Sequence, residues 1–474
     1  MHSRFYLSLL LISSLFVLGY TGLAVKRELS NEWHQHQSQY KDIMIKNAKS
    51  DVDRERASGI ETGVIKQIYL PSLNKADRCM SCHMGLENPL MAKGELPYKQ
   101  HSGDFLQTHA AANFGCTVCH LGQGRATNMK EAHGQSRDTF WDYPIIPFKY
   151  IQASCALCHD YKMLEEVGMH TVVKGERLFR EKGCLGCHKL DGVGGDLGAA
   201  LDGVASRPLL YFPMVNVVGD RNAYNWQRQH FDDPQAIVEG SEMKLTKLTK
   251  EEADQLTTFM FTLRKEEMPS NYKLIKNITT KATDGATLYT MYCSGCHDTG
   301  KQSIYDEVLD RTIPAISNPG FLRLTDDLTL KAIVDEGRSG TQMTSWKPTA
   351  SGLTKKELKE IINYISTNRP SQLPGPFYYK DYKHDSANGK TIYEQRCNFC
   401  HGDEGKGGGR KLGINLRNTT VQNILQPGFL AKTVLNGREK TPMPSFGPEG
   451  EGLSNQEIAD VIAYVKTFSK KKIQ

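Results

Sequence analysis

The cysteines of this 474-residue chain all lie in one recurring pattern, Cys-x-x-Cys-His, which occurs six times. Two thiols in this pattern can add to the vinyl groups of a haem, and the adjacent histidine is placed to bind the iron from the proximal side. Zinc knuckles, redox dithiols and structural disulfides also use paired cysteines, but six identical motifs with no cysteine left over favour six covalently attached haem c groups. The residues are Cys79, Cys82 and His83; Cys116, Cys119 and His120; Cys155, Cys158 and His159; Cys184, Cys187 and His188; Cys293, Cys296 and His297; and Cys397, Cys400 and His401.

The remaining histidines supply candidates for the distal side of the irons. No methionine between the first three motifs shares the register found later in the chain, so these haems are expected to take histidine on both sides. Three histidines lie within that segment and are the expected distal ligands: His101, His109 and His133. His170 is held in reserve, and Met84 is a weaker candidate because it directly follows the proximal His83. His230 and His384 are expected at the surface.

A unit of about a hundred residues occurs three times from residue 171 onward, and such internal repetition indicates related domains. Each unit opens with Gly-x-x-(Leu/Ile)-(Phe/Tyr) just before its haem motif. These glycines are Gly175, Gly285 and Gly389. Each unit closes with a predicted α-helix that begins in a capping box, a hydroxyl residue followed three positions later by Glu. The caps are Thr249, Thr354 and Ser454, and the apolar residues that follow them lie on one helical face.

Between the haem motif and the closing helix, each unit carries a methionine that we expect to bind the iron on the distal side. Met343 and Met443 occupy the same register, each six residues after a glycine. Met243 has a different spacing to its helix, and Lys244 follows it where a proline follows Met443. Methionine is otherwise a common core filler, so the matched register is the observation that favours ligation.

The N-terminal segment, residues 1–25, is predicted to be a transmembrane anchor. Phe5 to Val25 is uncharged and long enough to span a bilayer as a helix. A cleaved signal peptide is the competing interpretation. Haem is attached on the outer side of a bacterial inner membrane, so the haem domains are expected in the periplasm. Residues 26–67 are polar and charged and are predicted to form a helical stalk.

The formal net charge of +6 does not indicate nucleic-acid binding. Each haem brings two propionates, so six haems add roughly a dozen acidic groups to the charge balance. The chain also has no long run of basic residues. We therefore expect a membrane association and no nucleic-acid partner.

Residues 171–270, 275–370 and 380–470 each resemble a class I cytochrome c domain. The opening helix, haem motif, methionine loop and closing helix come in that family's order, and Cys397-Asn-Phe-Cys-His401-Gly-Asp-Glu-Gly-Lys-Gly-Gly-Gly resembles the family's glycine-rich loop after the haem. The resemblance implies a mainly α fold with three tandem helical domains, each enclosing one haem held by histidine and methionine.

Residues 68–170 are predicted to form a loop-rich segment with three bis-histidine haems. Phe114-Gly-Cys-Thr-Val-Cys-His-Leu-Gly-Gln-Gly-Arg and Ala132-His-Gly are similar to sequences in multihaem cytochromes that accompany membrane quinol-oxidising complexes of the bc type or the alternative complex III type. The resemblance implies such a complex as electron donor, with an oxidase or a soluble cytochrome of the respiratory chain as acceptor.

With both axial positions of every iron filled, the expected function is electron transfer rather than catalysis, because a catalytic haem needs an open or easily vacated site. Three alternatives stay open. The chain could be a multihaem enzyme with one open haem that reduces a nitrogen oxide or a peroxide. It could be the cytochrome subunit of a periplasmic dehydrogenase. An extracellular haem filament is the third alternative, and the predicted membrane anchor argues against it.

Overall fold

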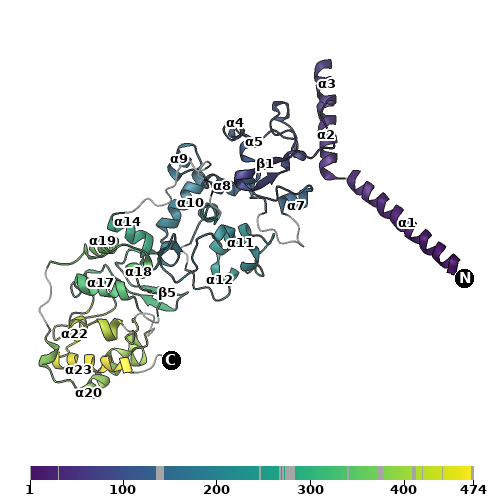
Figure 1. Cartoon of the computed structure of the whole chain (residues 1–474). Coiled ribbons are helices and arrows are strands. Elements are labelled where there is room, and N and C mark those ends of the chain that lie inside the picture. Colours follow the sequence, from purple (N-terminus) through teal and green to yellow (C-terminus); the bar gives the residue numbers. More distant parts are fainter. Residues whose placement is uncertain are drawn as a thin grey trace. The chain divides into compact units, whose positions relative to one another are not determined.

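The structure, a computed structural model, is mainly α-helical, with three short two-stranded hairpins among the residues it describes (Figure 1). It divides into two compact units. Unit 1 comprises Met1–Leu164, Arg207–Phe212 and Glu266–Lys276, and unit 2 comprises Glu165–Ser206, Pro213–Lys265 and Asn277–Gln474. The described residues are 2–29, 31–134, 144–244, 247–265, 268–269, 272, 283–338, 341–371, 377–407, 413–418, 420–439 and 441–470.

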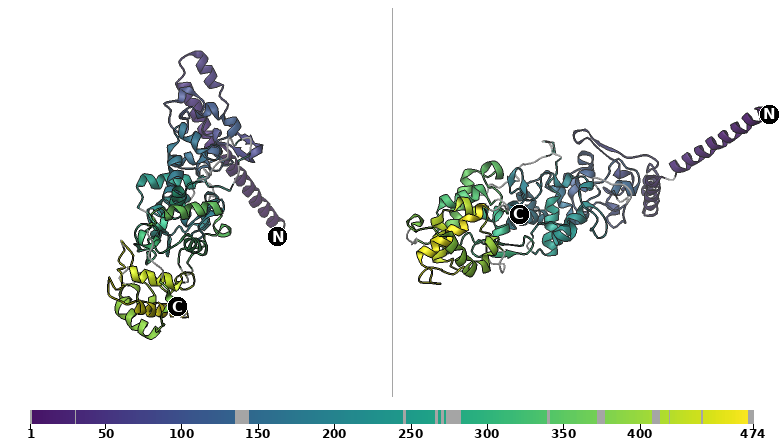
Figure 2. Two further views of the ribbon diagram at one scale, coloured as in Figure 1. Left: turned by 90° about the vertical axis from the view of Figure 1, so that its left-hand side faces the viewer. Right: turned by 90° about the horizontal axis from the view of Figure 1, so that it is seen from below.

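The first helix, α1 (His2–Leu29), contains the predicted apolar stretch and runs without a break in each view (Figures 1 and 2). From Arg4 to Lys26 it is long and apolar enough to cross a membrane, and none of that stretch is buried against the rest of the chain. An N-terminal signal sequence has the same properties. The helix is therefore a candidate membrane anchor or signal sequence.

Two further helices, α2 (Glu32–Lys46) and α3 (Asp51–Ser58), occupy the segment predicted to be a helical stalk. α2 buries one face, which includes Tyr40. Tyr40 packs with Met91 and Tyr98, and Met84 contacts the same cluster. The weaker candidate ligand Met84 thus lies in an apolar cluster.

The haem motifs of unit 1 lie in short elements joined by loops, as predicted for this segment. β1 pairs with β2 in an antiparallel hairpin. The elements are β1 (Ile68–Leu70), η1 (Pro71–Leu73), β2 (Lys75–Asp77), η2 (Cys79–Ser81), η3 (Pro89–Met91), α4 (Phe105–Thr108), α5 (Ala111–Phe114), α6 (Thr117–His120), α7 (Met129–His133), η4 (Phe148–Tyr150), α8 (Gln152–Cys155) and η7 (Leu209–Tyr211), with α9 (Tyr161–Glu166) at the boundary of the units.

Unit 2 contains the three repeated helical sets, and all three predicted capping boxes are present. In each, the cap hydroxyl accepts a hydrogen bond from the backbone of the Glu three positions later, and that Glu side chain accepts one from the cap backbone. The closing helices are α13 (Lys250–Met260), α19 (Lys355–Ser366) and α23 (Asn455–Lys466). The opening helices are α10 (His170–Glu181), α14 (Gly285–Tyr292) and α20 (Ser386–Arg396).

The remaining elements of unit 2 are short helices and two hairpins. They are η5 (Cys184–Gly186), β3 (Lys189–Leu190), β4 (Val193–Gly194), η6 (Val204–Ser206), α11 (Ala223–Asp232), α12 (Pro234–Ile237), α15 (Ser294–His297), β5 (Ile304–Asp306), β6 (Arg311–Ile313), α16 (Pro319–Leu322), α17 (Asp327–Glu336), α18 (Pro348–Ser351), η8 (Tyr379–Asp381), α21 (Asn398–His401), η9 (Asp403–Gly405), η11 (Thr420–Ile424), α22 (Pro427–Asn436) and η12 (Thr467–Lys470).

Each opening helix packs against the closing helix of the same repeat, and α20 and α23 are labelled close together in Figure 1. A glycine makes every one of these crossings possible. A Cβ on Gly175 would lie 2.1 Å from the Gln255 carbonyl oxygen. The equivalent distances are 2.2 Å from Gly285 to the Glu360 oxygen and 2.0 Å from Gly389 to the Asp460 oxygen. The opening glycine of the repeat is therefore a close-contact residue between two helices.

Candidate haem-binding sites

All six Cys-x-x-Cys-His motifs fold into one helical turn. In each, the backbone N–H of the histidine donates to the carbonyl of the first cysteine, at distances between 2.9 and 3.1 Å. This i to i+4 contact places the first cysteine and the histidine on the same side of the turn. None of the twelve cysteines, all of which the structure describes, is in a disulfide bond. The geometry is compatible with two thioether bonds and one axial ligand from each motif.

In unit 2 the proximal histidines are oriented by backbone carbonyls. Nδ1 of His188 lies 2.7 Å from the Ala199 oxygen, and Nδ1 of His297 lies 3.2 Å from the Pro314 oxygen. The third histidine follows the same rule, with Nδ1 of His401 lying 3.0 Å from the Ile414 oxygen. A hydrogen bond from Nδ1–H fixes the tautomer and leaves the Nε2 lone pair for a metal.

Burial keeps these imidazoles neutral. Desolvation lowers the pKa of all six motif histidines, and it lowers the pKa of His297 to about 4. A neutral imidazole is the form that binds a metal ion. The ring of His188 is also closely confined, since a Cβ on Gly198 would lie 2.4 Å from its Cε1 atom.

The three histidines predicted to be distal ligands in unit 1 each lie close to a different motif histidine. The ring centroids of His133 and His83 lie 6.2 Å apart, those of His101 and His120 lie 6.0 Å apart, and those of His109 and His159 lie 5.9 Å apart. A metal–imidazole bond is about 2 Å long, so two rings on opposite sides of one iron have centroids roughly 6 Å apart. Each pair therefore has the separation that a shared iron requires.

Local contacts hold these distal histidines in place. Nδ1 of His101 lies 2.9 Å from the Ser102 carbonyl oxygen, and Nδ1 of His109 lies 3.2 Å from that of Phe105. His133 ends α7, whose first backbone N–H groups include that of Met129. This N–H donates to a carboxylate oxygen of Glu32 in α2, at 2.7 Å. The reserve candidate His170 is exposed at the start of α10.

A buried carboxylate links the first two motifs. Asp77 accepts hydrogen bonds from the backbone N–H groups of Cys116, at 2.6 Å, and Thr117, at 3.0 Å. Its side chain is 1% exposed. A Cβ on either Gly115 or Gly124 would lie 2.2 Å from a carboxylate oxygen of Asp77, so both positions need glycine. The Cys79 and Cys116 thiols are in hydrogen-bonding contact at the same place.

The methionine loops of the second and third repeats are alike in detail. The backbone N–H of Arg338 donates to the Met343 carbonyl at 2.7 Å, and that of Arg438 donates to the Met443 carbonyl at 2.9 Å. In both loops the methionine N–H also donates to the threonine hydroxyl two residues earlier, at 3.2 and 3.3 Å. The matched register thus corresponds to a matched loop structure.

Met243 has a different neighbourhood. Its N–H donates to the Ser241 hydroxyl at 3.2 Å, but its sulfur lies 3.1 Å from Nε2 of His230. The prediction that His230 lies at the surface is wrong, because its ring is half-buried and stacks on Trp226, with ring centroids 4.5 Å apart. Desolvation, with a further contribution from His188, lowers the pKa of His230 to about 4. His384, by contrast, is exposed as predicted.

The first two motifs of unit 2 touch each other. The thiols of Cys187 and Cys296 are in hydrogen-bonding contact. A Cβ on Gly183 would lie 2.5 Å from the backbone nitrogen of Gly295, so two motif backbones meet at glycines. Lys244 Nζ forms an ion pair with the Asp306 carboxylate at 3.0 Å, and this contact joins the first repeat to the second.

Comparison with known families settles the nature of the repeats. Residues 172–264 match the family described as cytochrome c. Residues 280–365 and 384–465 match the family described as cytochrome C oxidase, cbb3-type, subunit III. The chain is a multihaem c-type cytochrome. The resemblance to cytochrome c domains is confirmed for the C-terminal region, and these domains bind haem c covalently and transfer electrons.

Two individual proteins show limited likeness to this cytochrome. The fructose dehydrogenase cytochrome subunit of Gluconobacter japonicus is 31% identical over 88 residues, a stretch that covers 17% of this chain and 18% of that subunit. In a solved structure of a reducing HAO-like protein complex of Kuenenia stuttgartiensis, one chain is 20% identical, with a TM-score of 0.27, covering 40% of this chain and 96% of that one.

Two buried arginines of the cytochrome fit the carboxylates that a haem would bring. Burial lowers the pKa of Arg338 to about 10, and burial together with repulsion from Arg338 lowers the pKa of Arg438 to about 10. Among the described residues, no carboxylate pairs with either guanidinium, and Nε of Arg438 has no hydrogen-bond partner. Arg438 lies over the Phe321 ring, with its guanidinium carbon 5.3 Å from the ring centroid. A buried cation without a carboxylate partner is costly, and the propionates of a bound haem would supply suitable anions.

Sequence reasoning missed three features of the candidate sites, namely the pairing of the histidines, the contact of His230 with Met243 and the two buried arginines. A signal existed for the arginines, because Arg338 and Arg438 each lie five residues before a predicted methionine ligand. The sequence carried no signal for which distal histidine lies beside which motif histidine, because that depends on how the loops of unit 1 fold.

Proposed function

We propose that the cytochrome carries six haem c groups and conducts electrons between them, with all six irons closed by protein ligands. The three close histidine pairs of unit 1 carry this proposal. His133, His101 and His109 would oppose His83, His120 and His159. Met243, Met343 and Met443 would close the remaining three sites opposite His188, His297 and His401.

The ligand sets imply an ordered series of reduction potentials. Methionine opposite histidine raises the potential of a haem iron, so the three downstream domains would accept electrons from the bis-histidine segment. No bond in a substrate needs to form or break. The chain contributes spacing, orientation and tuning of the potentials. The contacts between Cys79 and Cys116 and between Cys187 and Cys296 support short steps within each unit.

We further propose that α1 anchors the protein in the inner membrane, with the haem domains in the periplasm. The donor would be a quinol-oxidising membrane complex, and the acceptor an oxidase or a soluble cytochrome. The apolar helix and the covalent haem motifs support this location. The partners are tested by adding quinol to the purified cytochrome with and without membranes that contain the quinol-oxidising complex, and recording haem reduction. Reduction that does not depend on the membrane complex would contradict this assignment.

Carbon monoxide binding tests whether protein ligands occupy the sixth coordination position of every iron. The full-length protein is reduced completely, and its haem absorption is recorded before and after addition of the gas. An unchanged spectrum is expected, because each sixth position already holds a nitrogen or sulfur atom. Binding of one equivalent per chain would show an open site and favour a multihaem enzyme instead.

A second candidate function is that of a cytochrome subunit of a periplasmic dehydrogenase, which the likeness to the fructose dehydrogenase cytochrome subunit favours. Affinity purification from detergent-solubilised membranes distinguishes the two. Co-purification of a dehydrogenase that reduces the haems with its own substrate would support this candidate. Co-purification of quinol-oxidising membrane subunits would support the first.

A further inference from the structure

The first cytochrome domain holds a histidine beside its candidate methionine ligand. Nε2 of His230 lies 3.1 Å from Sδ of Met243. The imidazole stacks on Trp226 with an interplanar angle of 12°, and Nδ1 is buried with no hydrogen-bond partner among the described residues. A polar ring is therefore held in an apolar setting with its Nε2 atom directed at the thioether.

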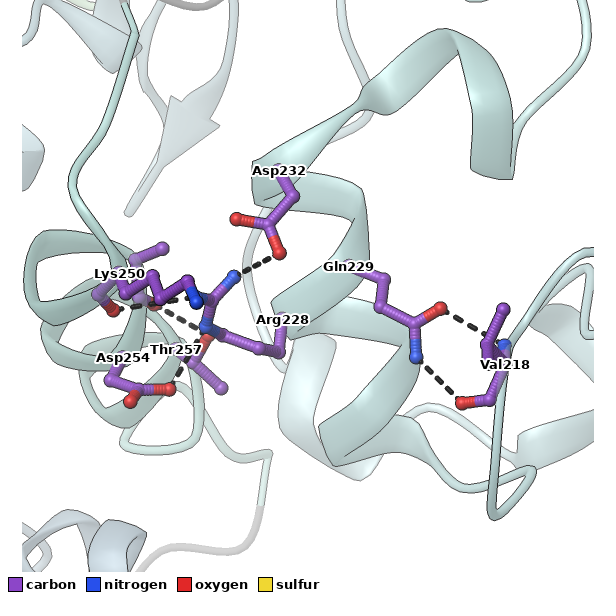
Figure 3. A network of polar contacts seen from close by, with 8 residues as sticks. Val218, Arg228, Gln229, Asp232, Lys250, Asp254 and Thr257 are labelled. Atoms are coloured by element: carbon purple, nitrogen blue, oxygen red, sulfur yellow. Dashed lines mark hydrogen bonds and ion pairs between the residues drawn. The ribbon is translucent and has the colours of Figure 1, made fainter.

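The helix that carries His230 is anchored on both sides, as Figure 3 shows. Arg228 Nε donates to the Asp254 carboxylate in α13 at 2.9 Å. The Gln229 side chain donates to the Val218 carbonyl at 2.9 Å and accepts from the Val218 N–H at 3.0 Å. These two residues directly precede His230, so the position of its backbone is fixed by the fold.

Two atoms that can bind iron, Nε2 of His230 and Sδ of Met243, thus lie side by side, whereas a haem iron would have one distal position for them. In a haem bound at Cys184 and Cys187, the porphyrin would take four positions on the iron and His188 the fifth, so a single distal position would remain. We propose that His230 is a second distal ligand at the haem of Cys184 and Cys187, and that it exchanges with Met243. The exchange breaks an iron–sulfur bond and forms an iron–nitrogen bond through the Nε2 lone pair, while the ring proton stays on Nδ1 and no electron leaves the protein.

The proposal rests on the proposed function, because it takes Met243 as one of the two ligands. Its consequence is a haem with two reduction potentials, a higher one with methionine and a lower one with histidine. The other two cytochrome domains lack this option. The only histidine in residues 275–370 is His297. In residues 380–470 the histidine outside the motif is His384, which stacks on Tyr379 and whose Nε2 lies 3.0 Å from the Tyr379 carbonyl oxygen.

That difference provides matched controls for the test. Met243→Leu, Met343→Leu and Met443→Leu are made singly in the full-length protein, because leucine conserves the volume of methionine. Each reduced variant is titrated with carbon monoxide, and the equivalents bound per chain are counted relative to the wild type. Met343→Leu and Met443→Leu should each gain one equivalent. Met243→Leu should gain none, because His230 fills the position, and Met243→Leu with His230→Ala should gain one.

One extra equivalent bound by Met243→Leu with His230 intact would overturn the proposal. A second measurement, on the wild type, tests the proposal even if the Met243→Leu variant folds poorly. In the wild type, electron paramagnetic resonance at partial oxidation should show a fourth bis-histidine signal that His230→Ala removes, and its absence would also overturn the proposal. Carbon monoxide binding by the wild type itself would instead contradict the closed-iron account, so the two failures are distinguishable.

Discussion

The imidazole rings of His83 and His133 lie close together, with centroids 6.2 Å apart, although the two residues are fifty positions apart in the sequence. The motif of the second haem lies between them along the chain. His133 and His109 each pair with a motif other than the one nearest in the sequence, whereas His101 pairs with its nearest motif, that of His120. Removing one member of a pair should affect a single, identifiable haem.

His133→Ala is expected to open one iron in unit 1. The proximal His83 remains, so the haem stays attached, but its distal position becomes free. The reduced variant should bind one equivalent of carbon monoxide per chain, whereas the wild type binds none. His170→Ala is the control, because the His170 side chain is exposed. Binding by the control variant, or none by His133→Ala, would contradict the assignment.

Arg438→Leu should lower the reduction potential of the last haem. A positive charge near an iron favours the added electron, and its removal has the opposite effect. Two unit charges about 10 Å apart at an effective dielectric constant near 20 interact by about 1.7 kcal/mol, which corresponds to roughly 70 mV for one electron. Spectroelectrochemical titration measures the shift. Arg438→Lys, which keeps the charge, should shift the potential much less.

Gly389→Ala should destabilise the last cytochrome domain. The added methyl group would lie 2.0 Å from the Asp460 carbonyl oxygen, and two helices would have to separate to accommodate it. Overpacking of this kind costs about 1 to 3 kcal/mol. Thermal unfolding followed by the haem absorption measures the loss. Gly59→Ala is the control, because its nearest contact would be 3.5 Å, and an equal loss there would refute the explanation.

Ser454→Ala should destabilise α23 by about 1 kcal/mol, since it removes the N-cap of the helix. The partner Glu457 adds a pH dependence, because hydrogen bonds from Ser454 lower the pKa of Glu457. A lowered folded-state pKa gives stability that is present above the unfolded value of about 4.3 and is lost as the pH falls through the folded value. Denaturant unfolding of Glu457→Gln and wild type should therefore differ at pH 7 and converge only as the pH falls through the folded-state pKa of Glu457, which lies below its unfolded value of about 4.3. A constant difference across this range would contradict the role of the carboxylate.

Sequence patterns predicted those elements whose hydrogen bonds form between residues close together in the chain. The capping boxes at Thr249, Thr354 and Ser454 begin helices because their hydrogen bonds form within four residues. The close approach at Gly175 was not predicted, since it depends on where Gln255 lies in space. His230 was predicted at the surface because its polarity is visible in the sequence, whereas the contacts of its ring with Trp226 and Met243 depend on how α11 packs.

The location of the irons tests the account most directly. Anomalous diffraction at the iron absorption edge, from crystals of the protein with its haems attached, would give the positions of the metal ions. We predict six iron peaks per chain, with one between His83 and His133, one between His101 and His120, and one between His109 and His159. An iron in unit 1 that is bound by only one histidine, with its expected partner turned away, would contradict the closed electron-transfer account.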